Sequence, residues 1–128
     1  MLAPSVLIVA FAGFLIFGVW SVADPASIGP MIDWDVTASP TAKVELQAMY
    51  GGLELGLAAL IAWCLADRKR HRFGLIVVAC TFGGLGLTRT AATLATSGVR
   101  DFHFWGIGLE LFALGAATFA LRRLPRET

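Results

Sequence analysis

Long apolar stretches alternate with short polar breaks along the whole chain. Four of the stretches have the length of about 20 mainly apolar residues that a helix needs to cross a hydrocarbon core of about 30 Å, and they cover residues 6–22, 46–66, 73–94 and 104–121. Between them lie a proline-bearing loop, a largely basic hexad and a short turn, which are typical of a bilayer surface. The pattern predicts an all-α fold, a four-helix transmembrane bundle that forms a single membrane domain over residues 1–128.

The composition agrees with a membrane protein and removes other classes. Of the 128 residues 57% are hydrophobic and 15% are charged, and the mean hydropathy of +0.75 lies outside the usual range of a soluble domain. A formal net charge of +1 excludes a strongly basic nucleic-acid-binding protein, so the expected partner is the lipid bilayer. Cys64 and Cys80 stand far apart without a CxxC motif, which predicts two buried thiols and no redox pair.

Basic residues beside the apolar stretches set the orientation, because Lys and Arg next to spans are retained in the cytoplasm. The basic hexad contributes Arg68, Lys69, Arg70 and Arg72, and the C-terminal tail contributes Arg122, Arg123 and Arg126. The opposite side carries only Lys43 and Arg100. Both termini are therefore expected on the cytoplasmic side. The basic residues of the hexad are further expected to contact anionic lipid headgroups.

Tryptophans mark the two interfaces of this arrangement, since amphipathic indole rings settle at headgroup level. Trp20, Trp34 and Trp105 fall at the expected outer surface, and Trp63 falls near the inner one. We interpret the loop around Trp34 as an interfacial connector in preference to a lid. At the end of this loop, Ser39-Pro40 predicts the start of the second helix.

The end of the first stretch allows a competing interpretation. Ser21-Val22-Ala23 ahead of Asp24 resembles a signal-peptidase site, and cleavage there would leave three helices. A signal peptide normally begins with a basic segment, which is missing ahead of this apolar run. We therefore expect the first stretch to be retained as a span.

Two acidic residues occupy matching places in the second and fourth stretches. Gly52-Leu53-Glu54-Leu55 is matched by Gly108-Leu109-Glu110-Leu111, which suggests two helical hairpins related by a parallel repeat. At a rise of about 1.5 Å per residue the two carboxyl groups share a depth in the bilayer. The long side chain of Arg89, on the third stretch, can reach the same depth.

These residues form a candidate polar cluster, made of Tyr50, Glu54, Arg89 and Glu110. Charges in hydrocarbon are costly unless they are paired, so we expect them to face one another. Tyr50 lies one helical turn before Glu54 and can join them. One interpretation is a structural clamp in which Arg89 holds both carboxylates. The other is a small binding cavity, because two acids against one base leave a negative charge that a proton, a cation or an amine can balance.

No catalytic residue, metal site or cofactor is predicted. Both histidines, His71 and His103, fall at surfaces, whereas a membrane haem usually takes axial ligands from within the spans. We interpret His103 as part of an interfacial aromatic cluster. The sequence also has no HExxH motif and no serine elbow. These observations favour a protein that is not an enzyme.

The segment 45–56, which reads Glu-Leu-Gln-Ala-Met-Tyr-Gly-Gly-Leu-Glu-Leu-Gly, is followed by Arg89 late in the third stretch and Glu110 in the fourth. In these features the chain resembles the bacterial domain-of-unknown-function family number 4345, small four-helix membrane proteins grouped with the DoxX-like proteins. The resemblance implies a four-helix transmembrane bundle in the bacterial inner membrane. It implies no activity.

Three functions are then open. The first choice is a non-catalytic accessory or structural subunit of a larger membrane assembly, partnered by other membrane proteins or by itself, because the accessory role known among DoxX-like relatives needs no catalytic residues. The alternative is a protein that binds a small ligand or lipid, or responds to protons, through the polar cluster. A quinone-linked redox enzyme is less favoured, since it would need a cofactor that the sequence does not predict.

Overall fold

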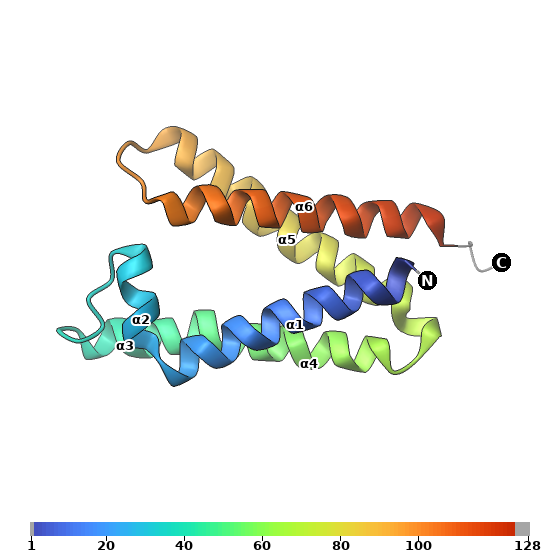
Figure 1. Ribbon diagram of the computed structural model, residues 1–128, viewed down its shortest axis with the longest axis horizontal. Coiled ribbons are helices and arrows are strands. Elements are labelled where there is room, and N and C mark those ends of the chain that lie inside the picture. The colour runs from blue at the N-terminus through green and yellow to red at the C-terminus, as the bar shows by residue number, and fades with distance from the viewer. Residues whose placement is uncertain (1, 125–128) are drawn as a thin grey trace. The chain divides into compact units, whose positions relative to one another are not determined.

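The computed structural model describes residues 2–124, and this part of the chain is almost entirely helical (Figure 1). Four helical segments are long and apolar enough to cross a membrane, namely Leu2–Ala23, Pro40–Leu65, Arg68–Ala95 and Asp101–Arg123. Each begins ahead of the stretch predicted from hydropathy, because apolar counting marks the hydrocarbon portion of a helix and not its polar ends. The predicted all-α fold with four helices of membrane-spanning length is confirmed. Arg126, counted above in the basic tail, lies outside the described residues.

Short helical turns connect or interrupt the long segments. α1 (Leu2–Ala23) is followed by α2 (Pro25–Ile28) and by the 3-10 turn η1 (Gly29–Ile32). The second long segment consists of α3 (Pro40–Leu46), the π-helical turn η2 (Gln47–Gly52) and α4 (Leu53–Leu65). The 3-10 turn η3 (Arg68–Arg70) then leads into α5 (His71–Ala95), and α6 (Asp101–Arg123) follows after a short turn.

The start of α3 is capped as the sequence predicts. Ser39 has an extended backbone, its Oγ accepts a hydrogen bond from the Ala42 N–H at 3.2 Å, and Pro40 follows in the first turn. Further along, the helix widens into the π turn η2, which ends on Gly51 and Gly52. Gly51 lies so close to Val22 of α1 that an added Cβ would overlap the Val22 side chain. A glycine is therefore required where this widened turn meets α1.

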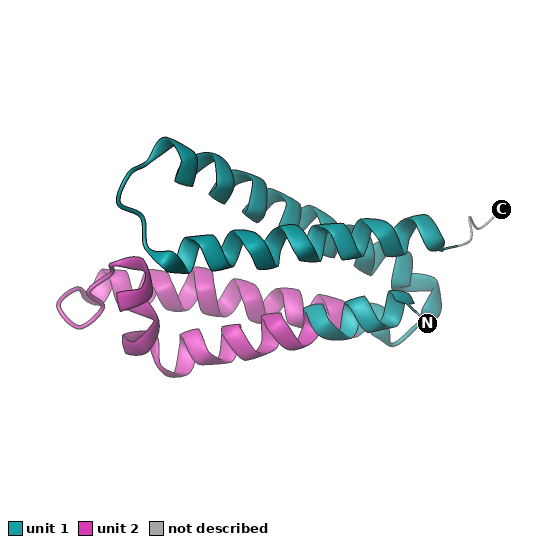
Figure 2. Ribbon diagram, turned by 45° about the horizontal axis from the view of Figure 1, so that its top comes forward, with its two compact units in different colours: residues 1–10, 63–128 teal, residues 11–62 magenta. Residues whose placement is uncertain are grey.

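The chain divides into two compact units (Figure 2). Unit 1 contains residues 1–10 and 63–128, and unit 2 contains residues 11–62. The boundaries between them fall within α1 and at the end of α4.

The loop of unit 2 between α1 and α3 folds around a small apolar core. Its buried members are Ile28, Val36 and Leu46, and the side chains packed against them are Phe17, Met31, Ile32, Trp34, Ala42 and Tyr50. Asp35 closes the far end of the loop, because its Oδ1 accepts hydrogen bonds from the Thr37 hydroxyl at 2.6 Å and from the N–H groups of Thr37 and Ala38 at 3.0 Å each. These bonds, the Thr37 hydroxyl first, hold the pKa of Asp35 below its ordinary value of 3.8.

Unit 1 is a hairpin of α5 and α6 to which the first turns of α1 are added. The turn between the two helices includes Gly98, whose φ of +76° is the left-handed conformation that glycine adopts without strain. At the other end of the hairpin, Gly74 of α5 lies against Leu7 of α1, where an added Cβ would come within 3.0 Å of the Leu7 side chain. The start of α1, the start of α5 and the end of α6 thus lie at one end of unit 1 (Figure 2).

The two cysteines differ in burial. Cys64 is buried and its Cβ faces Gly74, whereas Cys80 of α5 is exposed. The prediction of two buried thiols is therefore wrong for Cys80. The hydropathy of a spanning stretch shows that a residue lies among apolar neighbours, but not which side of its helix is packed.

In each unit, a glycine on one helix packs closely against a Glu-Leu pair on the next helix. In unit 2 an added Cβ on Gly18 would lie 3.1 Å from the Glu54 Cβ and 3.0 Å from the Leu55 Cγ. In unit 1 an added Cβ on Gly86 would lie 3.1 Å from both the Glu110 Cβ and the Leu111 Cδ2. The same helix-to-helix contact therefore recurs at the two Gly-Leu-Glu-Leu segments that suggested a repeat.

Candidate functional site

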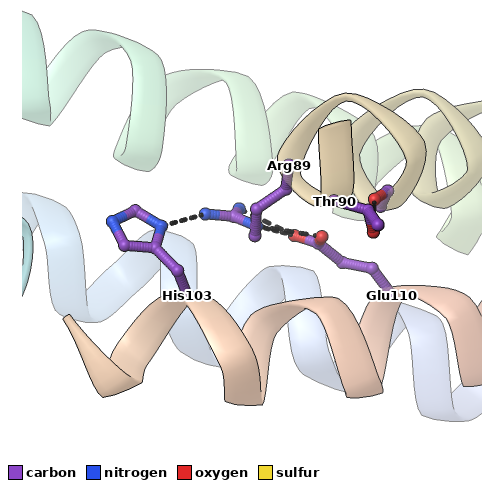
Figure 3. A network of polar contacts seen from close by, with 5 residues as sticks. Arg89, Thr90, His103 and Glu110 are labelled. Carbon is purple, nitrogen blue, oxygen red and sulfur yellow. Dashed lines mark hydrogen bonds and ion pairs between the residues drawn. The ribbon is translucent and has the colours of Figure 1, made fainter. Parts of the chain in front are cut away.

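Arg89 of α5 and Glu110 of α6 form a bidentate ion pair inside unit 1 (Figure 3). The Arg89 Nη2 donates to the Glu110 Oε1 at 2.7 Å, and Nε lies 3.0 Å from each carboxylate oxygen. The pair is largely enclosed, since 20% of the Arg89 side chain and 9% of the Glu110 side chain are exposed. Charge-assisted bonds of this fork-to-fork kind are among the strongest in proteins, so the pair joins the two helices of the hairpin.

His103 extends the pair along α6. Its Nδ1 lies 3.2 Å from the Arg89 Nη1, on the side of the guanidinium that faces away from Glu110 (Figure 3). A guanidinium only donates, so Nδ1 is the acceptor and the imidazole proton is on Nε2 in this arrangement. His103 was interpreted from the sequence as an interfacial aromatic residue, and the structure places it beside Arg89. The signal that could have found it is its position two helical turns before Glu110, on the same face of α6.

Small residues on both helices make room for the pair. An added Cβ on Gly106, one turn before Glu110, would lie 3.2 Å from the Arg89 Nε and 3.3 Å from its Cδ. On α5, Gly86 leaves room for the Glu110 Cβ, and the Thr90 hydroxyl turns back to donate to the Gly86 carbonyl at 2.6 Å. A Cβ at position 106 would therefore force the Arg89 side chain to shift by a few tenths of an ångström.

Unit 2 carries different side chains at the corresponding positions. Ser21 follows Gly18 by three residues, as Arg89 follows Gly86 in unit 1. Tyr50 precedes Glu54 by one helical turn, as Gly106 precedes Glu110. A small residue on one helix and a large one on the other are thus exchanged between the units. Gln47, in the place of His103, also reaches the preceding helix, since its Nε2 donates to the Val22 carbonyl at 2.8 Å.

Of the four residues in the predicted cluster, the structure brings Arg89 and Glu110 together. Tyr50 and Glu54 belong to unit 2. There the Tyr50 ring packs edge-on against Phe17 and Trp34, with ring centroids 6.4 Å and 6.2 Å away, and Glu54 lies against Gly18. The buried Ser21 hydroxyl has no hydrogen-bond partner among the described residues. A functional role for the four-residue cluster stays a prediction.

Two of the basic residues expected at the membrane surface contact aromatic rings. Arg70 stacks on Trp63 with its Cζ 4.1 Å from the ring centroid, and it donates to the Trp63 carbonyl at 3.2 Å. Its Nε lies 3.9 Å from the Asp67 Oδ2. On α6, the Cζ of Arg123 lies 5.1 Å from the Phe119 ring. Arg70 and Arg123 are therefore occupied by aromatic neighbours within unit 1.

Trp20 and Trp34 lie in unit 2. Trp20 is partly exposed, and its Nε1 donates to the Ser27 hydroxyl at 2.7 Å. Trp34 contributes to the small core of the loop. Trp63 and Trp105, in unit 1, are exposed. Their place at lipid interfaces stays a prediction.

Within residues 2–124, no three His, Cys, Asp or Glu side chains are grouped as a metal ion would require. The polar network of unit 1 consists of a base, an acid and an imidazole that satisfy one another. Such an arrangement can hold two helices together.

The comparison with protein families gives one match. A family model described as a domain of unknown function, DUF4345, matches residues 3–121, which is nearly the whole chain. No curated protein and no solved structure matches the chain significantly.

Proposed function

The chain belongs to the domain-of-unknown-function family DUF4345, and we propose that it acts as a non-catalytic accessory or structural subunit of a larger membrane assembly. The proposed location is a bacterial inner membrane. The four helices of membrane-spanning length and the concentration of basic residues in the hexad and at the end of α6 support this location.

One observation carries the proposal. The Glu110 carboxylate accepts hydrogen bonds from the Arg89 guanidinium, and the guanidinium also contacts His103. A catalytic acid or base, or a counter-ion for a ligand, needs a lone pair or proton directed at a space where a substrate can lie. The closed network instead supports the role of a clamp that keeps the hairpin rigid.

An exposed apolar face of α6 offers a surface for the partner chain. Trp105, Leu109 and Phe112 follow one another along this face and are 77%, 69% and 75% exposed. Gly108 and Gly115 lie on the flank of this stripe, and a Cβ added to either would meet nothing within 4 Å. Glycine in a helix interior lowers stability by about 1 kcal/mol relative to Ala, and it brings no benefit where the helix faces lipid. Close approach of a second helix, in contrast, requires such small residues.

Photo-crosslinking from this face tests the proposal. A benzophenone side chain is placed at Phe112, or as a matched control at Leu94 of α5, which is 83% exposed and has no open helical glycine within one turn. We expect crosslinks to one defined chain, this protein or another membrane protein, from position 112 and not from position 94. Gly115→Leu should abolish the crosslink, because it fills the space that a second helix would occupy.

Native mass spectrometry of the protein extracted from its own membrane in mild detergent provides the second measurement. An additional protein chain that remains bound, and is lost in Gly115→Leu, is the expected result. A bare monomer that carries a small bound mass, lost in Glu110→Gln, would overturn the subunit proposal. It would make the polar cluster a ligand-binding site instead.

A further inference from the structure

Unit 1 contains a cavity of about 330 Å³ where α6 ends and α5 begins. Its walls are formed by Arg72, Thr118, Leu121, Arg122 and Leu124. Thr118, Leu121 and Arg122 are three and four residues apart and share one face of α6, while Arg72 stands in the first turn of α5. The cavity is therefore a product of the hairpin, which brings together two arginines that are far apart in the sequence.

Both arginines are available to an external anion. Arg72 and Arg122 are exposed, no acidic residue lines the cavity, and neither guanidinium has an ion pair or side-chain hydrogen bond with any residue between 2 and 124. Two arginines near them in the sequence are instead engaged with aromatic rings, since Arg70 stacks on Trp63 and Arg123 on Phe119. Two like charges that line one small space repel each other unless an anion lies between them.

We infer that this cavity binds a negatively charged phosphate group, supplied by the phosphodiester of an anionic phospholipid or by free phosphate. Two planar guanidinium forks suit the tetrahedral oxygens of a phosphate. Thr118 donates its hydroxyl proton to the Leu114 carbonyl, so the donors for the anion are the two arginines. The volume is at the lower end of the range of about 300–1,000 Å³ found for ligand pockets, which fits a phosphate headgroup.

The apolar part of the lining gives the lipid phosphate a place for its glycerol backbone. Leu121 faces the cavity from the last turns of α6, and Leu124 follows the helix end. Hydropathy places this end of the hairpin at a membrane surface, beside the basic hexad.

The test is a binding titration of the full chain in mild detergent, with native mass spectrometry as the readout. The probes are phosphatidylglycerol, phosphatidylcholine and inorganic phosphate. The variants are Arg122→Gln and Arg72→Gln, with Arg123→Gln as the matched control, since Arg123 neighbours Arg122 in sequence but stacks on Phe119. Arg122→Lys, which keeps the charge and loses the fork, serves if the glutamine variant does not fold.

We expect phosphatidylglycerol to bind more tightly than phosphatidylcholine. Each of Arg122→Gln and Arg72→Gln should weaken that binding roughly tenfold, the factor that one charge-assisted hydrogen bond supplies, and Arg123→Gln should leave it unchanged. Binding of inorganic phosphate alone, with the same dependence on Arg122, would support the site and identify free phosphate as its source. Equal binding of the two lipids, or an equal loss in Arg123→Gln, would overturn the inference.

Discussion

The strength of the Arg89–Glu110 pair can be measured by a double-mutant cycle in which each residue is replaced by Gln, singly and together. Removing one partner of an enclosed ion pair leaves the other charge without its counter-charge, which costs about 3–5 kcal/mol. Because 20% of Arg89 is exposed, we expect the lower end of this range for Glu110→Gln, about 3 kcal/mol, and a similar loss for Arg89→Gln. The double variant has no unpaired charge, so its loss should be below about 2 kcal/mol, and the two single losses should not add.

The free energy of unfolding can be followed by the loss of helical circular dichroism as SDS is titrated into protein in mild-detergent micelles at neutral pH. Glu45→Gln is the matched control, because Glu45 is an exposed acid on α3 and its replacement should change the free energy by less than about 0.5 kcal/mol. A double variant as unstable as the sum of the single variants would refute the clamp. So would a Glu110→Gln variant as stable as the control.

Three further predictions concern packing and the loop of unit 2. Gly86→Ala should lower the unfolding free energy by about 1 kcal/mol, because crowding against Glu110 exceeds the gain in helix propensity. Gly84→Ala is the matched control and should be neutral or stabilising, because an added Cβ there would meet nothing within 4 Å. Equal effects of the two substitutions would contradict the close packing of α5 on α6. Ser21→Ala should stabilise the protein by about 1 kcal/mol in the same assay, since it removes a buried hydroxyl without a partner in the described chain, and a loss would show that the hydroxyl is bonded. In an NMR titration the Asp35 carboxyl should ionise with a pKa below 3.8, so its contribution to stability is present at neutral pH and is lost as the pH falls through the lowered pKa. Thr37→Val should move the titration midpoint back toward 3.8, because it removes the hydroxyl that donates to Asp35. A wild-type midpoint at or above pH 3.8 would refute the hydrogen bonding of the loop.

The pairing of Arg89 with Glu110 could be predicted from the sequence because charges inside apolar stretches are few and their depths can be counted. A rise of about 1.5 Å per residue puts both near the same level, and the cost of an unpaired charge leaves few other arrangements. The same reasoning could not assign His103 to the pair. Its rotation about the α6 axis, and not its depth, decides that it faces Arg89; the spacing of seven residues from Glu110 carries that information, but a count of depths does not use it.

The repeat was likewise only partly predictable from the sequence. The match between residues 52–55 and 108–111 was visible in the sequence, but the glycines that seat the two segments, Gly18 and Gly86, are not part of any matching motif. Likewise, nothing in the sequence shows that Tyr50 in one unit takes the place of Gly106 in the other. Such exchanges of large and small residues become visible only when the helices are packed.

By itself the sequence determined the number of long helices, their approximate ends and the capped start of α3, because each of these follows from local composition and from the length a helix needs to cross a bilayer. Only the tertiary structure decided which face of each helix is packed. That choice makes Cys80 exposed, places His103 beside Arg89, and leaves Arg72 and Arg122 without partners among residues 2–124, while Arg70 and Arg123 stack on aromatic rings. The physical reason is that a nearly uniform apolar helix carries little amphipathic signal, so its rotation is set by contacts with other helices.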